Sequence, residues 1–213
     1  MESSIVEYIK AGVLFSKTSK QFITLAMGPL ILVIVIGLGP GLILKNEFLV
    51  LSMIMVVTSV AFLFSVFFCS RGKLNIKKRL ILQSLIYLDF VLQFQLLIIV
   101  FFIMWKGFGW QLVLICLPTI LLPVFIGGRN TNLIKNGTYS NTTQKSGSIT
   151  FAWTGVAGAL IAKIFFDNIT QDLALLIVIL SFFVINCFLS IGLLSIHRLY
   201  YFYKLEQKGI LID

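Results

Sequence analysis

"LILQSLIYLDFVLQFQLLIIVFFIM", residues 80 to 104, is long and apolar enough to cross a lipid bilayer as one helix. It nevertheless contains five polar side chains: Gln83, Ser84, Asp89, Gln93 and Gln95. At 100° per residue these side chains point in several directions, and a helix that is polar on several sides is poorly suited to face lipid. The stretch therefore predicts a helix that is enclosed by other helices.

The whole chain has the composition of an integral membrane protein. Only 12% of its 213 residues are charged and 59% are hydrophobic, with a mean hydropathy of +1.03, whereas about a quarter of the residues in soluble domains are charged. The apolar runs are continuous, whereas the strands of a membrane barrel alternate in polarity. We therefore expect an all-α, polytopic integral membrane protein that forms a six-transmembrane-helix bundle.

The expected transmembrane domain covers residues 21 to 196. Its six spans lie at about 21–43, 48–69, 80–104, 110–127, 150–166 and 173–196. Residues 1 to 20 are too polar to cross, but Ile5, Ile9 and Val13 recur at helical spacing, and Ser4 with Glu7 matches a capping box. This pattern predicts a short amphipathic helix lying on the membrane surface, and no cleavable signal peptide is apparent.

The basic residues predict the orientation. Of 17 Lys and Arg, 14 lie in four segments: residues 1–20, the loops 70–79 and 128–149, and the tail 197–213. Under the positive-inside rule these segments, and both termini, are cytoplasmic and the protein lies in the plasma membrane. The net charge of +9 then lies beside the anionic inner leaflet, which favours lipid attraction over nucleic-acid binding.

All four prolines lie in two of the predicted spans. The first span contains Pro29 and Pro40, and the fourth contains Pro118 and Pro123. Proline in a membrane helix commonly produces a kink. Paired proline-interrupted helices in corresponding positions are also typical of a transporter binding site, so the prolines leave both interpretations open.

The fifth span carries a stripe of small residues that lets another helix approach closely, consisting of Ala152, Gly155, Ala159 and Ala162. Lys163 lies close to this stripe on the helical wheel. It has two possible roles: an ion pair with Asp89, or extension of its ammonium group toward the outer interface near Asp167.

Asp89 is the most informative ionisable residue within the spans. It shares a helix face with Gln93, four residues later, so the two side chains are expected to hydrogen-bond. Three interpretations of Asp89 stay open: a structural hydrogen bond, an ion pair with Lys163, or a functional polar site. Asn186 in the sixth span is expected to hydrogen-bond a neighbouring helix.

Catalytic and metal-binding patterns are weak. Cys69, Cys116 and Cys187 show no metal-ligand spacing, and residues 127 to 148 lack the spacing of a phosphate-binding loop. Cys69 and His197 share the basic face, but no third residue that would orient them as a nucleophilic pair is evident. We expect no enzyme, no cofactor and no metal.

Two functional hypotheses remain. Scattered amide and hydroxyl side chains in nearly charge-free spans favour a non-catalytic interaction protein that recognises another membrane protein or peptide. It would be an accessory subunit or an immunity factor against a membrane-active toxin. The alternative is a transporter or exporter permease subunit, with its site between the proline-containing first and fourth spans.

Overall fold

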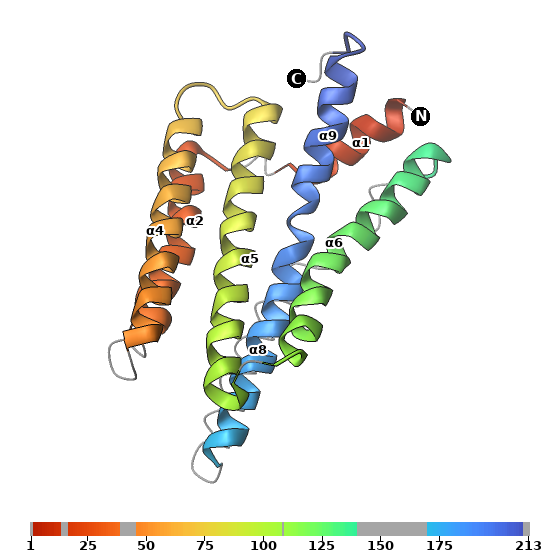
Figure 1. Ribbon diagram of the computed structural model, residues 1–213. Helices are drawn as coiled ribbons and strands as arrows, with labels where there is room; N and C mark the ends of the chain where they lie inside the picture. Colours follow the sequence, from red (N-terminus) through yellow and green to blue (C-terminus); the bar gives the residue numbers. More distant parts are fainter. Residues whose placement is uncertain (1, 14–16, 39–45, 108, 140–169, 211–213) are drawn as a thin grey trace.

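The computed structural model describes residues 2–13, 17–38, 46–107, 109–139 and 170–210, and within these ranges the regular structure is all helical (Figure 1). The elements are α1 (Glu2–Ala11), α2 (Ser19–Leu32), the π-helical η1 (Val33–Leu38), α4 (Asn46–Cys69), α5 (Ile76–Lys106), α6 (Gln111–Lys135), α8 (Gln171–Ile191) and α9 (Leu194–Glu206). The predicted all-α class is confirmed.

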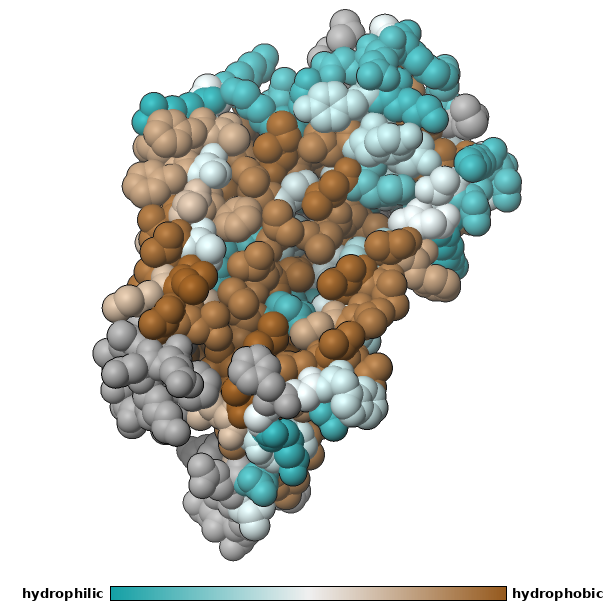
Figure 2. All heavy atoms as spheres, viewed as in Figure 1, coloured by the Kyte–Doolittle hydropathy of each residue, from teal (hydrophilic) through white to brown (hydrophobic). Residues whose placement is uncertain are grey.

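Five helical stretches in the described part of the chain are long and apolar enough to span a membrane. They correspond to the predicted first, second, third, fourth and sixth spans. Figure 2 shows hydrophobic residues across the middle of the bundle and hydrophilic residues gathered at the end that carries both termini. The protein is therefore a multi-pass membrane protein, as its composition predicts.

The predicted fifth span lies outside the described residues, and so do Pro40, Lys163 and the stripe Ala152, Gly155, Ala159 and Ala162. The elements on either side of this span are described. α6 ends where both termini lie, whereas α8 begins at the opposite end of the bundle (Figure 1).

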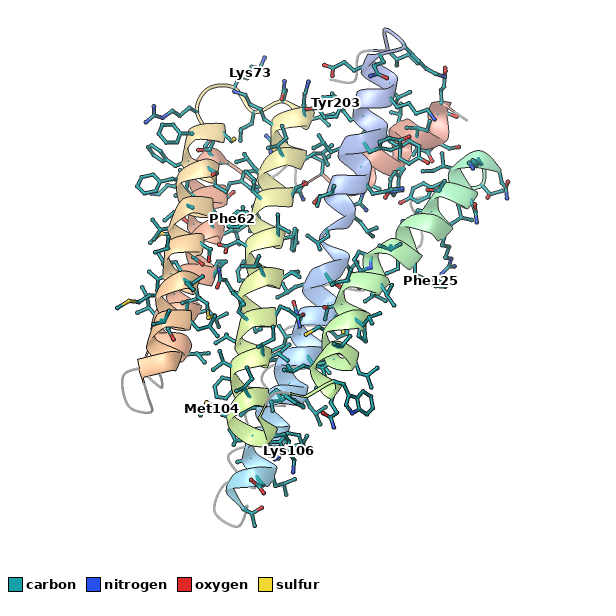
Figure 3. The ribbon with its side chains drawn as sticks, in the orientation of Figure 1. Phe62, Lys73, Met104, Lys106, Phe125 and Tyr203 are labelled. Carbon is teal, nitrogen blue, oxygen red and sulfur yellow. The ribbon has the colours of Figure 1, made fainter. Side chains whose placement is uncertain are left out.

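We call the end that carries both termini and the α4–α5 connection the basic end. Lys73 and Tyr203 lie there, whereas Met104 and Lys106 lie at the opposite end (Figure 3). Both termini and the first loop thus share one end of the bundle, which agrees with the grouping of basic segments in the sequence.

α5 is the central helix of the described bundle. Of the residues in its apolar stretch, 44% are buried, compared with 22% or less in each of the other four candidate spans. α2 and α4 pack on one side of α5, while α8 and α9 pack on another (Figure 1). Among the described helices, the α5–α8 contact is the most extensive. The prediction from residues 80 to 104 is confirmed.

Two helices continue beyond the predicted span boundaries at the basic end. The fourth span was expected to end at residue 127, but α6 continues to Lys135, with Asn136 as its C-cap and Gly137 at φ +68°. Gly127 and Gly128 precede that point but do not end the helix, and the buried side chain of Ile134 packs in the cluster formed with α1 and α9. The helix therefore continues about two turns into the segment 128–149 that its polarity predicts to be a loop.

The expected tail from residue 197 is also helical as far as Glu206. A short break at Gly192 and Leu193 separates α8 from α9. Because the two helices together are longer than the roughly 30 Å hydrocarbon layer requires, α9 extends beyond the layer. Its Tyr201, Phe202 and Leu205 are buried against α1 instead of forming a free tail.

α1 docks on the bundle by its apolar face. Ile5, Tyr8 and Ile9 are buried against residues of α6 and α9. The helix begins at Glu2, so Ser4 lies inside it; a capping box is found instead at the start of α2, between Thr18 and Gln21. The amphipathic helix predicted from the sequence is present, but its apolar face contacts protein.

The prolines that the structure describes do not end their helices. Pro29 lies within α2, which changes to the π-helical η1 at Val33, four residues later. The missing N–H of proline removes one hydrogen bond of the α-helical ladder, and a local π turn is a common way to accommodate such a defect. Pro118 and Pro123 both lie inside the continuous helix α6.

Candidate functional site

The polar side chains of α5 contact α4 through a buried cluster. Asp89 Oδ1 accepts hydrogen bonds from Ser59 Oγ at 3.2 Å and from Gln93 Nε2 at 3.1 Å. Gln93 Nε2 also donates to Thr58 Oγ1 at 2.9 Å. The hydrogen bond expected between Asp89 and Gln93 is therefore present, and together the two residues connect α5 to α4.

Gln95 points to the other side of α5 and joins three helices. Its Oε1 accepts hydrogen bonds from Thr119 Oγ1 of α6 at 2.8 Å and from Asn186 Nδ2 of α8 at 2.9 Å. Its Nε2 donates to Cys116 Sγ of α6 at 2.6 Å. Asn186 thus contacts a neighbouring helix, as the sequence predicts, and its partner is Gln95.

Two further polar residues of α5 contact elements near the basic end. Gln83 Nε2 donates to the Gly12 carbonyl, which follows α1, at 3.0 Å. Ser84 Oγ donates to Ser195 Oγ of α9 at 2.9 Å. The polar residues that point in different directions on the helical wheel therefore each bind a different neighbour.

A groove with a volume of about 890 Å³ lies between α5 and α6. Its apolar lining comes from Leu88, Val91, Leu92 and Leu96 of α5, from Ile120, Pro123 and Val124 of α6, and from Leu193, Ile196 and Tyr200 at and after the α8–α9 break. α5 and α6 diverge toward the basic end, with α9 between them in the view of Figure 1. The volume lies in the range of ligand-binding sites, roughly 300–1,000 Å³.

Polar groups line the groove at two places along its length. Gln95 and Thr119, already hydrogen-bonded to each other, contribute at one place. His197 contributes at the other, next to Gly127 and Gly128 of α6. A Cβ added to Gly128 would meet nothing within 4 Å, so the groove is open beside that residue.

His197 is fixed by hydrogen bonds from both sides of its ring. Its Nδ1 lies 2.6 Å from Tyr8 Oη, and its Nε2 lies 3.1 Å from Thr131 Oγ1. Burial raises the pKa of Tyr8 to about 12, partly opposed by the Arg198 guanidinium, so this phenol is neutral at physiological pH. As a neutral donor to Nδ1, Tyr8 favours the tautomer with the proton on Nε2, which then donates to Thr131.

The possible nucleophilic pair is not brought together by these contacts. Cys69 packs with the buried cluster of α2, α4 and α5 that includes Phe22 and Leu82. Both ring nitrogens of His197 are already engaged by Tyr8 and Thr131. No group of three potential metal ligands is present in the described ranges of the chain.

Comparison with protein-family models, with curated proteins and with solved structures finds no match for this chain. The groove is consequently the main guide to function. The sequence analysis does not predict it: there Pro123 is interpreted as a kink or as part of a transporter site shared with the first span. The available signal was the run from Ile120 to Gly128, in which apolar side chains at helical spacing end in two adjacent glycines.

The proline-containing spans do not face each other in the described residues. α2 packs on α4 and α5, whereas α6 packs mainly on α8. Figure 1 places α2 and α6 on opposite sides of α5. Pro29 therefore does not share a groove wall with Pro123, which lines the groove described above.

Proposed function

We propose that the protein is a non-catalytic, membrane-embedded binding protein that receives an apolar transmembrane segment of another protein or peptide between α5 and α6. The observation that carries this proposal is the apolar groove of about 890 Å³ along these two helices. An amphipathic or apolar helix that lies in a hydrophobic groove is a recurrent mode of recognition.

The exposed face of α6 supports a helical partner. Val113, Leu117, Ile120 and Val124 are exposed and follow a 4-3-4 spacing, which forms one stripe along the helix. α6 is also the least covered candidate span, with 11% of its apolar stretch buried. Gly128 continues this face, and because a Cβ there would meet nothing within 4 Å, it would let a partner backbone approach closely.

The polar chemistry within the bundle also supports binding more than transport. The described polar side chains of α5 are used in hydrogen bonds between helices, such as those of Gln95 with Thr119 and Asn186. Polar residues of this kind stabilise helix association in lipid, whereas ion and proton pathways require several ionisable groups. An exporter permease subunit is the alternative, and its expected site between the proline-containing spans lacks support in the α2–α6 arrangement.

The proposed location is the plasma membrane, with the basic end and both termini in the cytoplasm. This orientation rests on the positive-inside rule, and it places most of the net charge of +9 beside anionic lipid headgroups. The proposed partner is an apolar membrane-inserted polypeptide. The proposed role of the protein is accordingly that of an accessory subunit or of an immunity factor against a membrane-active toxin.

Site-specific photo-cross-linking in native membranes tests the proposed function. Val124 lines the groove and Val57 lies on α4, and both are 67% exposed, so they form a matched pair. A photoreactive residue at 124 is expected to give an adduct with one defined membrane polypeptide, and the same residue at 57 is not. Gly128→Trp, which fills the groove, is expected to abolish the adduct at 124 while the protein stays folded.

The outcomes separate the two functional hypotheses. Equal adducts at both positions, or an adduct at 124 that persists in Gly128→Trp, would contradict binding in the groove. Stoichiometric recovery of a nucleotide-hydrolysing subunit in mild detergent would instead support the exporter alternative.

A further inference from the structure

The Asp89 carboxyl group lies deep in the contact between α4 and α5. Asp89 is 2% exposed and Gln93 is fully buried. We propose that Asp89 is a proton-binding site: in the folded protein it holds a proton on Oδ2 and is a neutral carboxylic acid.

The hydrogen bonds of the cluster leave two acceptor oxygens without donors. Asp89 Oδ1 accepts from Ser59 and Gln93, but Asp89 Oδ2 is buried and has no hydrogen-bond partner among the described residues. Gln93 Oε1 is also buried, and the described part of the chain supplies no partner for it. An ionised carboxylate with one bare oxygen is strongly disfavoured in an apolar interior, because it loses hydration without gaining a donor or a counter-charge.

The described parts of the neighbouring helices offer no counter-charge in the contacts of Asp89. The titratable residues of α2, α4 and α8, which pack against α5, are Lys20, Glu47, Cys69, Asp172 and Cys187. α9 also packs on α5, and its titratable residues all lie from His197 onward, toward the basic end. Lys20, Glu47, Cys69 and Asp172 lie within two residues of a helix terminus, and the hydrogen bonds of the Asp89 carboxyl group involve only Ser59 and Gln93. The nearest titratable neighbours along α5 are Tyr87 and, much farther away, Arg79 and Lys106.

A single proton on Oδ2 removes the negative charge. It forms one O–H bond and turns a bare anionic oxygen into a neutral hydroxyl, which costs far less to bury than an ion. The proton comes from solvent water during insertion or folding, so no other reactant is needed. The α4–α5 link is then a neutral hydrogen-bonded contact, which costs less to bury than an ion.

Infrared spectroscopy of the full-length protein in lipid vesicles at neutral pH tests this proposal. The expected result is a C=O stretching band of a neutral carboxylic acid that is lost in Asp89→Asn. Glu206→Gln is the matched control, because Glu206 is an exposed acid that pairs with Lys77 on the surface. This control is expected to leave the band unchanged.

Isotope labelling gives the same answer without a substitution. The chain has four aspartates, of which the other three, Asp167, Asp172 and Asp213, lie outside the predicted spans. Carbon-13 in the aspartate carboxyl groups is expected to shift the neutral-acid band of the unmodified protein. Absence of that band, or a band that the label does not shift, would show that Asp89 is ionised. An ion pair with Lys163 would then be the better interpretation.

Discussion

Replacing Gly192 with alanine is expected to lower the free energy of unfolding by about 2 kcal/mol, the usual cost of overpacking a closely fitted contact. Gly192 lies at the break between α8 and α9 and faces α5. A Cβ there would overlap the Tyr87 ring, including the ring atom closest to the α5 backbone, so the whole side chain would have to move. Reversible unfolding in mixed micelles measures the change.

Two variants make the Gly192 prediction specific. Gly128→Ala is the matched control, because a Cβ there meets nothing within 4 Å, and it is expected to be neutral or slightly stabilising. Tyr87→Ala removes the ring, so adding Gly192→Ala to that variant is expected to cost much less than it does in the unmodified protein. Equal costs in both backgrounds would show that Gly192 and Tyr87 do not touch.

Replacing Gln95 with leucine is expected to destabilise the bundle by about 2 kcal/mol, since three interhelical hydrogen bonds are lost at roughly 0.6 kcal/mol each in membranes. The substitution weakens the contacts of α5 with both α6 and α8, because Gln95 hydrogen-bonds Cys116, Thr119 and Asn186. It also leaves the Asn186 amide without this acceptor. The same unfolding measurement applies.

The comparison for Gln95 is Gln111→Leu. Gln111 is exposed at the start of α6, and its replacement is expected to change stability by less than about 0.5 kcal/mol. Asn186→Leu combined with Gln95→Leu is expected to cost less than the sum of the single changes, because both remove one shared hydrogen bond. Strict additivity would contradict the interaction.

The central position of α5 could be predicted because two sequence properties constrain it together. Residues 80 to 104 are long enough to span, yet Gln83, Asp89 and Gln95 project in different directions. Each of these side chains needs a hydrogen-bond partner that lipid cannot supply. The identity of those partners could not be predicted, because short polar residues such as Ser59 and Thr119 occur on every described α-helix.

The structure at the basic end was harder to predict because polarity marks the edge of the lipid, not the end of a helix. α6 continues past residue 127 to Lys135, and α9 continues to Glu206. Both are stabilised there by burial of Ile134 and Leu205 against α1. That tertiary packing joins segments far apart in the chain, so local hydropathy carries no sign of it.

The groove could not be predicted for a related reason. Its apolar lining residues, such as Leu92 and Val124, are the same residue types that face lipid elsewhere. The groove forms because α5 and α6 diverge toward the basic end, with α9 between them (Figure 1). This divergence depends on how the helices are placed and not on their composition. Gln95 connects α5 to α6 and α8 by buried hydrogen bonds, so the proposed function depends on contacts of this kind.

Oxidative cross-linking between Ser84→Cys and Ser195→Cys, in a protein without its three native cysteines, tests this arrangement most directly. The two serine oxygens are 2.9 Å apart, on α5 and α9. The account predicts rapid disulfide formation in intact membranes, and none when Ser84→Cys is paired with Ser65→Cys on the exposed side of α4. Failure of the first pair, or cross-linking of the second, would contradict a bundle organised around α5.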